Sequence, residues 1–287
     1  MNAYELYNLI DNDFELNSCV DYWEMKFSEY IADDFKNKSM GLVLDNTCTI
    51  NKVYTAVFPT YAILDKLLHS GEKDILLFTH HPKIWDITKV PAFIDISEDY
   101  LKRLKENKIS MYTLHTPLDK NGPYSTSVNL ANILDIKINE EFCEDEGVKI
   151  GIIGSTNLNH IEQLYIKVSG TTGHTVKLFR YGNNIIKGSK VALIAGGGNI
   201  SDILPELHEK GINTFITGVT RIEEKFEPSV IFHRIANELG INIIGATHYS
   251  TEKYACIEVV KYFKNLKIKA EFMEGIYDLE DLEDLEK

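Results

Sequence analysis

DILLFTHHP, at residues 74–82, is an apolar run that ends in two histidines and a proline. An unbroken run of this length is typical of a strand buried on both faces of a sheet. Proline cannot donate to a sheet ladder and drives the preceding residue out of the helical region, so the strand should end there. We therefore predict a buried strand over residues 74–79, with His80 and His81 at its carboxyl end.

The same alternation of apolar runs and amphipathic segments continues on both sides of this strand. We predict further strands at residues 53–58, 109–114, 190–195, 214–218 and 242–246, and helices at residues 61–69, 97–107, 127–134, 201–210, 228–239 and 251–265. Strands that alternate with helices of this length indicate βαβ units. The predicted fold class is α/β, in two similar halves with mixed, mostly parallel sheets. We assign the halves to residues 1–135 and 136–287, with the crossing between them in the stretch 135–189, and expect the acidic tail after residue 277 to be a solvated end.

Composition narrows the class of protein. The chain has 287 residues, a net charge of −13 and 44% hydrophobic residues, which is an ordinary globular mixture. The excess of acids argues against nucleic acid as a partner, because phosphate binding needs clustered Lys and Arg. No apolar run has a membrane-spanning length, residues 1–16 lack the pattern of a signal peptide, and the four cysteines show no paired spacing. We expect a reduced cytoplasmic protein that is not in a membrane.

Four predicted strands end in residues that suit a ligand site. In open α/β sheets, ligand groups collect beyond the carboxyl ends of the strands. The residues at these ends are His80 and His81, His115 with Asp119, Gly196 to Gly198, and His248 with Glu252. Imidazole and carboxylate without thiolate suit Zn, Mn, Fe, Co or Ni better than Ca or Mg. Adjacent strand residues point to opposite faces, so His80 and His81 would each serve a different ion of a close pair, with Asp119 and Glu252 available as bridges.

Other interpretations of these residues stay open at this level. A single histidine is more often a surface or core residue than a ligand, and His-x-x-x-Glu arises readily on any helix. Only the joint occurrence of these residues at strand ends indicates a metal site. Gly196 to Gly198 meets the context of a dinucleotide-binding loop, but Ser201 replaces the third glycine and no acid follows about 20 residues later. The loop is instead predicted to hold an anion such as phosphate, or to be a plain strand-to-helix turn. No G-x-S-x-G motif supports a serine nucleophile.

Taken in order, the motifs resemble a known family. Those that carry the resemblance are FTHHP at residues 78–82, LHTPLD at 114–119, the strand and glycine loop at 191–198, Thr217-Gly218, and GATHYSTE at 245–252. The sequence is similar to the Nif-three-like dinuclear metal-centre hexameric proteins, also called the GTP cyclohydrolase 1 type 2 family. The resemblance implies two divalent metal ions per chain, held by His80, His81, Asp119, His248 and Glu252. It leaves His115 beside them as a supporting residue or proton shuttle, and it implies a homohexamer.

The functional expectation follows from these residues and the resemblance together. We expect a metal-dependent hydrolase of two α/β halves packed around a shared metal site. Its small-molecule substrate would be a nucleotide or a phosphorylated compound, by similarity to GTP cyclohydrolase. The alternative is a metal-binding regulatory or scaffold protein without turnover, since a fold can carry either role.

Overall fold

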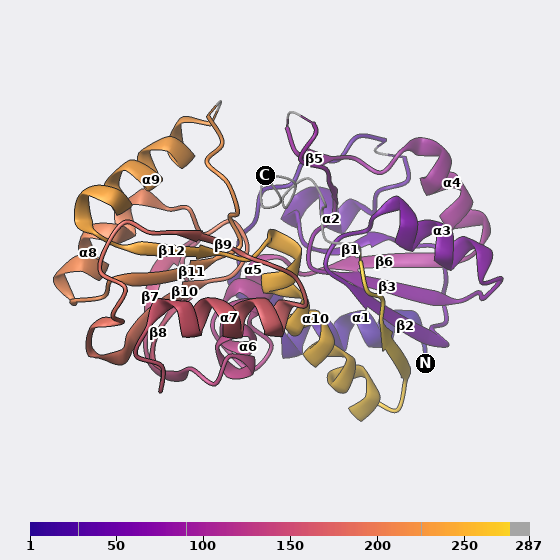
Figure 1. Ribbon diagram of the computed structural model, residues 1–287. Coiled ribbons are helices and arrows are strands. Elements are labelled where there is room, and N and C mark those ends of the chain that lie inside the picture. Colours follow the sequence, from indigo (N-terminus) through magenta and orange to yellow (C-terminus); the bar gives the residue numbers. More distant parts are fainter. Residues whose placement is uncertain (28, 90, 225, 276–287) are drawn as a thin grey trace. The chain divides into compact units, whose positions relative to one another are not determined.

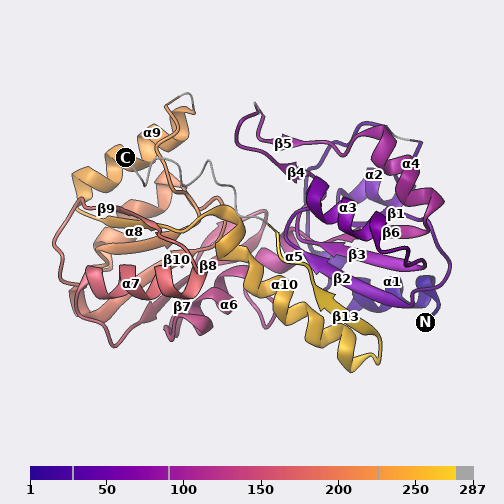
Figure 2. The ribbon, with the colours of Figure 1, turned by 45° about the vertical axis from the view of Figure 1, so that its right-hand side comes forward.

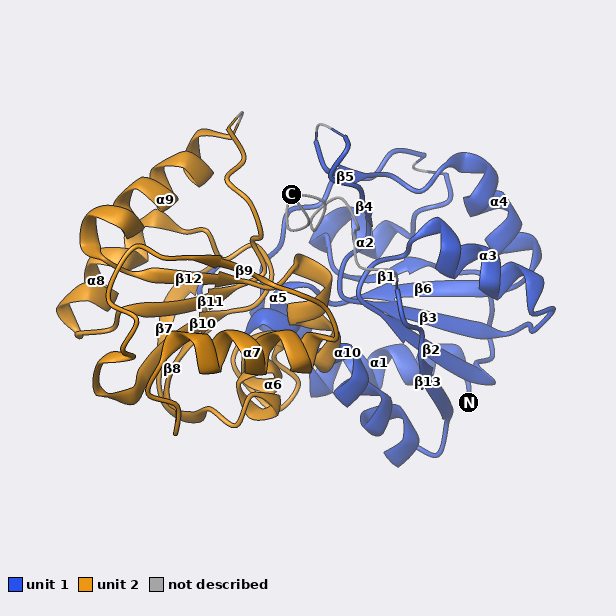
Figure 3. Cartoon of the chain, in the orientation of Figure 1, with its two compact units in different colours: residues 1–120, 146–148, 255–276 blue, residues 121–145, 149–254, 277–287 orange. Residues whose placement is uncertain are grey.

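The computed structural model describes residues 1–27, 29–89, 91–224 and 226–275. The chain forms two compact units, shown in Figure 3. Unit 1 comprises residues 1–120, 146–148 and 255–276, and unit 2 comprises residues 121–145, 149–254 and 277–287.

Unit 1 contains a five-stranded sheet in the order β1-β6-β3-β2-β13. Its strands are β1 (Gly41–Leu44), β2 (Lys52–Ala56), β3 (Ile75–Thr79), β6 (Ile109–Thr113) and β13 (Lys269–Phe272). β3 lies at the centre, parallel to both β2 and β6, and all of its residues are buried. β13 is parallel to β2, whereas β1 is antiparallel to β6. The apolar run at residues 75–79 is therefore the central strand of its sheet, as its lack of polar alternation predicts.

Helices cover both faces of this sheet (Figure 1). The helices of unit 1 are α1 (Ala3–Asp13), α2 (Asp33–Lys38), α3 (Tyr61–His69), α4 (Glu98–Glu106) and the one-turn α5 (Thr116–Asp119), with a 3₁₀ turn at Leu16–Ser18. The core on one face joins buried residues of α2, α3 and α4 to alternate residues of the strands. On the other face, Phe78 of β3 packs edge-on against Phe263 and stacks on Tyr112. A short hairpin, β4 (Ile84–Trp85) and β5 (Phe93–Ile94), follows β3.

Unit 2 contains a six-stranded sheet in the order β7-β8-β10-β11-β12-β9. Its strands are β7 (Lys137–Asp145), β8 (Val148–Ser155), β9 (Lys177–Phe179), β10 (Lys190–Ile194), β11 (Thr214–Thr217) and β12 (Asn242–Gly245). The three central strands are parallel, and β8 and β9 run antiparallel to them on the two sides. β11 and β12 are buried throughout, so this sheet too is covered on both faces.

Side chains alternate between two cores along the strands of unit 2. Its helices are α6 (Thr126–Ile133), α7 (Ile161–Thr172), α8 (Leu204–Glu209), α9 (Glu227–Leu239) and the start of α10 (His248–Asn265), with 3₁₀ turns at Lys187–Ser189 and Ser201–Ile203. Val191 and Leu193 of β10 join the core beneath α6 and α7. Ala192 and Ile194 join the opposite core, beneath α8 and α9. The period of two along a strand thus distributes one apolar run between two helical layers.

The predicted α/β class with mixed, mostly parallel sheets is confirmed. The compact units, however, divide differently from the predicted halves 1–135 and 136–287. Residues 121–135 belong to unit 2 because α6 packs in the core of its sheet, and residues 255–275 belong to unit 1 because β13 pairs with β2. Figure 2 shows β13 at the edge of the first sheet, beside β2. A return of the chain to its first sheet leaves no local sequence pattern, so the prediction missed it.

Two predicted helices also differ clearly from those in the structure. Helix α10 begins at His248 rather than at Thr251. The helix predicted over residues 201–210 is a 3₁₀ turn followed by the short α8, in which Pro205 occupies the first turn. The predicted acidic end after residue 277 lies outside the described residues. In the described ranges, no helix combines the length and the apolar character that crossing a membrane would require.

Candidate metal centre

The first donors of unit 1 follow directly from the end of β3. The amides of His80 and His81 continue the sheet pattern by donating to the carbonyls of Ala56 and Val57, at 3.2 and 3.0 Å. Both histidines are fully buried, and their rings lie edge-to-face with centroids 4.3 Å apart. Pro82 then ends the extended segment, as predicted. The sheet therefore holds two imidazoles side by side in a water-excluded position.

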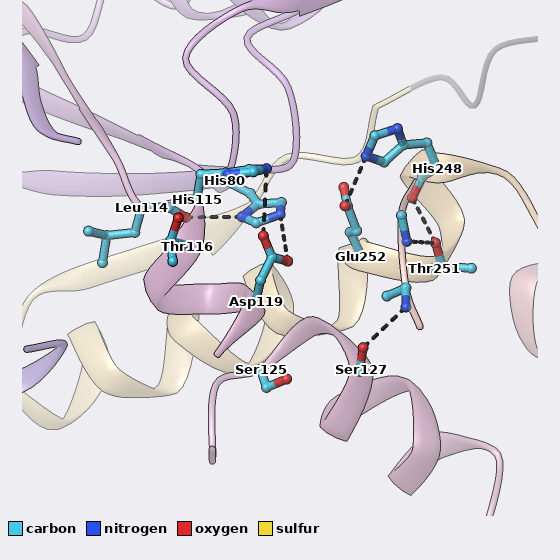
Figure 4. A network of polar contacts seen from close by, with 12 residues as sticks. His80, Leu114, His115, Thr116, Asp119, Ser125, Ser127, His248, Thr251 and Glu252 are labelled. Atoms are coloured by element: carbon cyan, nitrogen blue, oxygen red, sulfur yellow. Dashed lines mark hydrogen bonds and ion pairs between the residues drawn. The ribbon is translucent and has the colours of Figure 1, made fainter. Parts of the chain in front are cut away.

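Each of these imidazoles has a defined orientation. Nδ1 of His80 lies 3.0 Å from the carbonyl oxygen of Leu114, which directs its Nε2 toward Oδ1 of Asp119 at 3.4 Å (Figure 4). The ring of His81 stacks on Phe58, with centroids 4.5 Å apart and an interplanar angle of 16°. Backbone and aromatic contacts thus fix both rings without any exposed side chain taking part.

The second pair of donors in unit 1 comes from the single turn after β6. His115 precedes α5, and Pro117 in the first turn favours the helical backbone there. Residues four apart on one turn face the same side, so Nε2 of His115 lies 3.5 Å from Oδ2 of Asp119 (Figure 4). The ring of His115 also stacks near His80, with centroids 5.0 Å apart. The LHTPLD motif therefore brings an imidazole and a carboxylate to the histidines of β3, as its position at a strand end predicts.

Asp21, which belongs to no sequence motif, completes this cluster. Its Oδ2 lies 3.1 Å from Nδ1 of His115. Burial opposes ionisation of Asp21, but the hydrogen bond and charge of His115 outweigh it and lower the pKa of the carboxyl group. Burial likewise opposes protonation of His115, yet the charges of Asp119 and Asp21 raise the pKa of its imidazole. The two residues are 94 positions apart, and no motif around Asp21 could have indicated the contact.

The donor set of unit 1 fits a metal ion in kind and placement. Ligand atoms of His80, His81 and His115 all lie within 4.8 Å of one another. The set is imidazole and carboxylate with no thiolate, which suits the transition metals predicted from the sequence. His80 and His81 are also fully buried, whereas histidines without a partner or a ligand are usually more exposed. The described residues therefore include a cluster that could hold a divalent metal ion.

The remaining predicted ligands, His248 and Glu252, belong to unit 2. They lie one turn apart at the start of α10, with Nε2 of His248 2.9 Å from Oε1 of Glu252 (Figure 4). Glu252 is almost fully buried. Thr247, the residue before the helix, has a φ of 63°, a conformation that costs free energy for a β-branched residue. The backbone thus accepts local strain at the point where it turns from β12 into the helix that carries both donors.

The glycine loop packs directly against these two donors. A Cβ atom at Gly196 would lie 2.2 Å from Oε1 of Glu252 and 3.1 Å from Nε2 of His248, and Gly196 has a φ of 69°. Its amide donates to Oγ1 of Thr251 at 2.8 Å (Figure 4). Glycine is required at position 196 because the backbone there passes too close to the Glu252 carboxylate to leave room for a side chain.

The predicted anion-binding role of Gly196 to Gly198 gains no support from this geometry. The amide of Gly198 donates to the carbonyl of Gly196, and that of Asn199 donates to the carbonyl of Gly197. The Gly196 amide donates to Thr251, so three of the four amides of residues 196–199 are used within the chain. The helix that follows, α8, has only six residues, so it adds little dipole for an anion.

His174 lies near the start of α10 and belongs to none of the sequence motifs. Helix α7 ends at Thr172, and Gly173 adopts the left-handed conformation with a φ of 85°. His174 then places Nε2 2.8 Å from Oγ of the buried Ser250, one turn into α10. Residues 170–174 are therefore a helix end that contacts the start of α10 through His174.

Fold and donors together define a class: an α/β protein with a buried histidine–carboxylate cluster at strand ends that could hold metal. A sequence model of the Duf34/NIF3 (NGG1p interacting factor 3) family matches residues 16–278. The chain belongs to this family, which confirms the resemblance seen in its motifs.

Named relatives and solved structures agree with this assignment. A GTP cyclohydrolase 1 type 2 homolog of Borreliella burgdorferi is 27% identical over 257 residues, covering 90% of this chain and 93% of the relative. One of Pyrococcus horikoshii is 31% identical over 210 residues, covering 70% of this chain and 76% of the relative. Among solved structures, the protein ybgI, described as of unknown function, has a TM-score of 0.74 at 21% identity and covers 96% of this chain and 99% of its own. A Thermus thermophilus protein, TTHA1606, has a TM-score of 0.68 at 22% identity, with coverage of 96% and 99%. These structural likenesses establish the fold.

Proposed function

We propose that the protein is a metal-dependent hydrolase that holds two divalent ions through His80, His81, Asp119, His248 and Glu252. The observation that carries the proposal is the unit 1 cluster, where buried imidazoles and a carboxylate converge at the ends of two parallel strands. The assignment of His248 and Glu252 as ligands is supported by their sequence motif and by the contact between their side chains within unit 2. Carboxylates at Asp119 and Glu252 are the groups able to bridge two ions a few ångströms apart, because a neutral imidazole offers only one lone pair.

The three histidines of the unit 1 cluster each have a proposed chemical task. Bound divalent ions would supply Lewis acidity, which activates water and polarises a phosphoryl or ring-carbon electrophile. His80, with Nδ1 at the Leu114 carbonyl, offers Nε2 as a neutral nitrogen donor. His115 can hold or release a proton at Nε2, beside Asp119, and is the proposed proton shuttle. The fully buried rings of His80 and His81 exclude water from one side of the donors.

The proposed substrate is a nucleotide or a phosphorylated small molecule. This part rests on family membership and on relatives that carry the name GTP cyclohydrolase 1 type 2 homolog. A metal-activated water suits both the opening of a purine ring and the hydrolysis of a phosphoester, so both substrate classes belong in the test.

The test combines metal content with turnover. Elemental analysis of protein purified without chelator should approach two equivalents of divalent metal, and Asp119→Ala or Glu252→Ala should lose both ions because a bridging ligand serves both. A panel of nucleotides and phosphoesters is then assayed with metal-loaded and chelated protein, with Glu258→Ala as a control acid on the same helix, paired at the surface with Lys261. Equal turnover in loaded and chelated samples would contradict the mechanism. Full metal content without turnover on any substrate would favour a regulatory or scaffold role.

A further inference from the structure

The orientation of His115 depends on a residue outside every motif. Oδ2 of Asp21 accepts hydrogen bonds from Nδ1 of His115 at 3.1 Å and from the backbone amide of Thr116 at 3.4 Å. Its Oδ1 accepts from the amide of Tyr22 at 2.8 Å. The side chain of Asp21 is only 8% exposed. A buried carboxylate with three donors around it is a fixed acceptor.

The segment that carries Asp21 is itself held against the cluster. Oγ1 of Thr116 donates to the carbonyl of Val20 at 2.8 Å, and Oγ of Ser39 donates to the carbonyl of Trp23 at 3.2 Å. The indole of Trp23 lies edge-on to both His115 and His81, with centroids 5.3 and 6.0 Å away. These backbone and ring contacts on both sides of Asp21 hold the segment in place, and they thereby position its carboxylate against His115.

This contact selects one form of the imidazole. A neutral imidazole carries its proton on one nitrogen and a lone pair on the other. Carboxylate oxygens face both ring nitrogens of His115: Oδ2 of Asp21 lies 3.1 Å from Nδ1, and Oδ2 of Asp119 lies 3.5 Å from Nε2. A carboxylate can only accept, so the shorter contact, with Asp21, keeps the single proton of the neutral ring on Nδ1. The lone pair is then on Nε2, the atom that lies 3.5 Å from Oδ2 of Asp119.

We propose that Asp21 is a positioning residue of the candidate metal centre, holding His115 with its proton on Nδ1 and its Nε2 lone pair toward Asp119. Carboxylates behind histidines commonly fix the tautomer in this way around metal sites. What His115 does with that lone pair rests on the proposed function. The tautomer itself is a property of the chain and can be measured without metal or substrate.

The test is the side-chain ¹⁵N–¹H correlation spectrum of metal-free protein labelled with ¹⁵N-histidine, at an alkaline pH where the ring carries one proton. Signals of His115 are assigned by their loss in His115→Gln. Wild type should show the proton on Nδ1. Asp21→Asn should lose that state in favour of a proton on Nε2, because the asparagine amide can donate to Nδ1. Asp21→Glu should restore it, and Asp33→Asn, which removes the same charge from an exposed position in unit 1, should match wild type.

Two results would overturn the proposal: a proton on Nε2 in wild type, or an unchanged tautomer in Asp21→Asn. The thermal midpoint of each variant shows whether it is folded, and the wild-type spectrum decides the question even if Asp21→Asn is not. Absence of bound metal from wild-type protein would instead defeat the proposed function and leave the tautomer measurement intact.

Discussion

Gly196 shows how a single residue serves the candidate site through its lack of a side chain. Its backbone passes so close to Glu252 that a Cβ atom would overlap the carboxylate, and its positive φ adds a second reason for glycine. Asp21 acts in the opposite way, because it contributes through a side chain buried behind His115. Neither residue is a proposed ligand, yet both determine where a proposed ligand or shuttle lies.

We expect Gly196→Ala to reduce metal content and lower stability, since the new methyl group must displace the Glu252 carboxylate. Gly188→Ala is the matched control, because Gly188 has a similar φ of 60° and nothing within 4 Å of the added atom. Both variants should lose roughly 1 kcal/mol to backbone strain. Only Gly196→Ala should also lose bound divalent metal, measured by elemental analysis. Equal metal content in the two variants would show that the close approach to Glu252 has no consequence for the site.

At the scale of elements, helix α9 buries a histidine that no motif explains. His233 is 3% exposed and packs against Phe179, with Nδ1 3.0 Å from the hydroxyl of Tyr181. Its Nε2 has no hydrogen-bond partner among the described residues. Burial lowers the pKa of His233 to about 4, so the ring stays neutral in the folded protein at neutral pH.

This burial predicts a loss of stability in mild acid. The unfolded chain takes up a proton at His233 near pH 6.5, whereas the folded chain does so only near pH 4. The free energy of unfolding should therefore fall as pH drops through this window, by up to roughly 3 kcal/mol from this group. Chemical denaturation at pH 7 and pH 4.5 measures it. The free energy of unfolding of His233→Gln should fall less between these two pH values than that of wild type. His208→Gln, at an exposed position, should fall as much as wild type. Equal falls in all three proteins would remove His233 as the cause.

At the scale of the whole molecule, each unit is a sheet with helices on both faces, and the chain contributes to each unit from separated stretches. The proposed assembly is a homohexamer, which rests on the family resemblance and agrees with the general preference for closed symmetry. Light scattering at micromolar concentration and physiological salt should give a mass near 196 kDa, six chains of 32.7 kDa. A single species of one chain's mass would contradict this prediction.

The sequence by itself determined the fold class and the parallel strands other than β13, and it indicated the motif residues of the candidate site. It could do so because these features depend only on short stretches of sequence. The unbroken apolar run at residues 75–79 predicts a strand that is buried on both faces, and Pro82 cannot continue the hydrogen bonds of a sheet. The tertiary structure alone decided that β13 joins β2, that Asp21 reaches His115 and that Gly196 meets Glu252. These contacts join segments far apart in the chain, and they depend on strand order and backbone path, which no local pattern encodes.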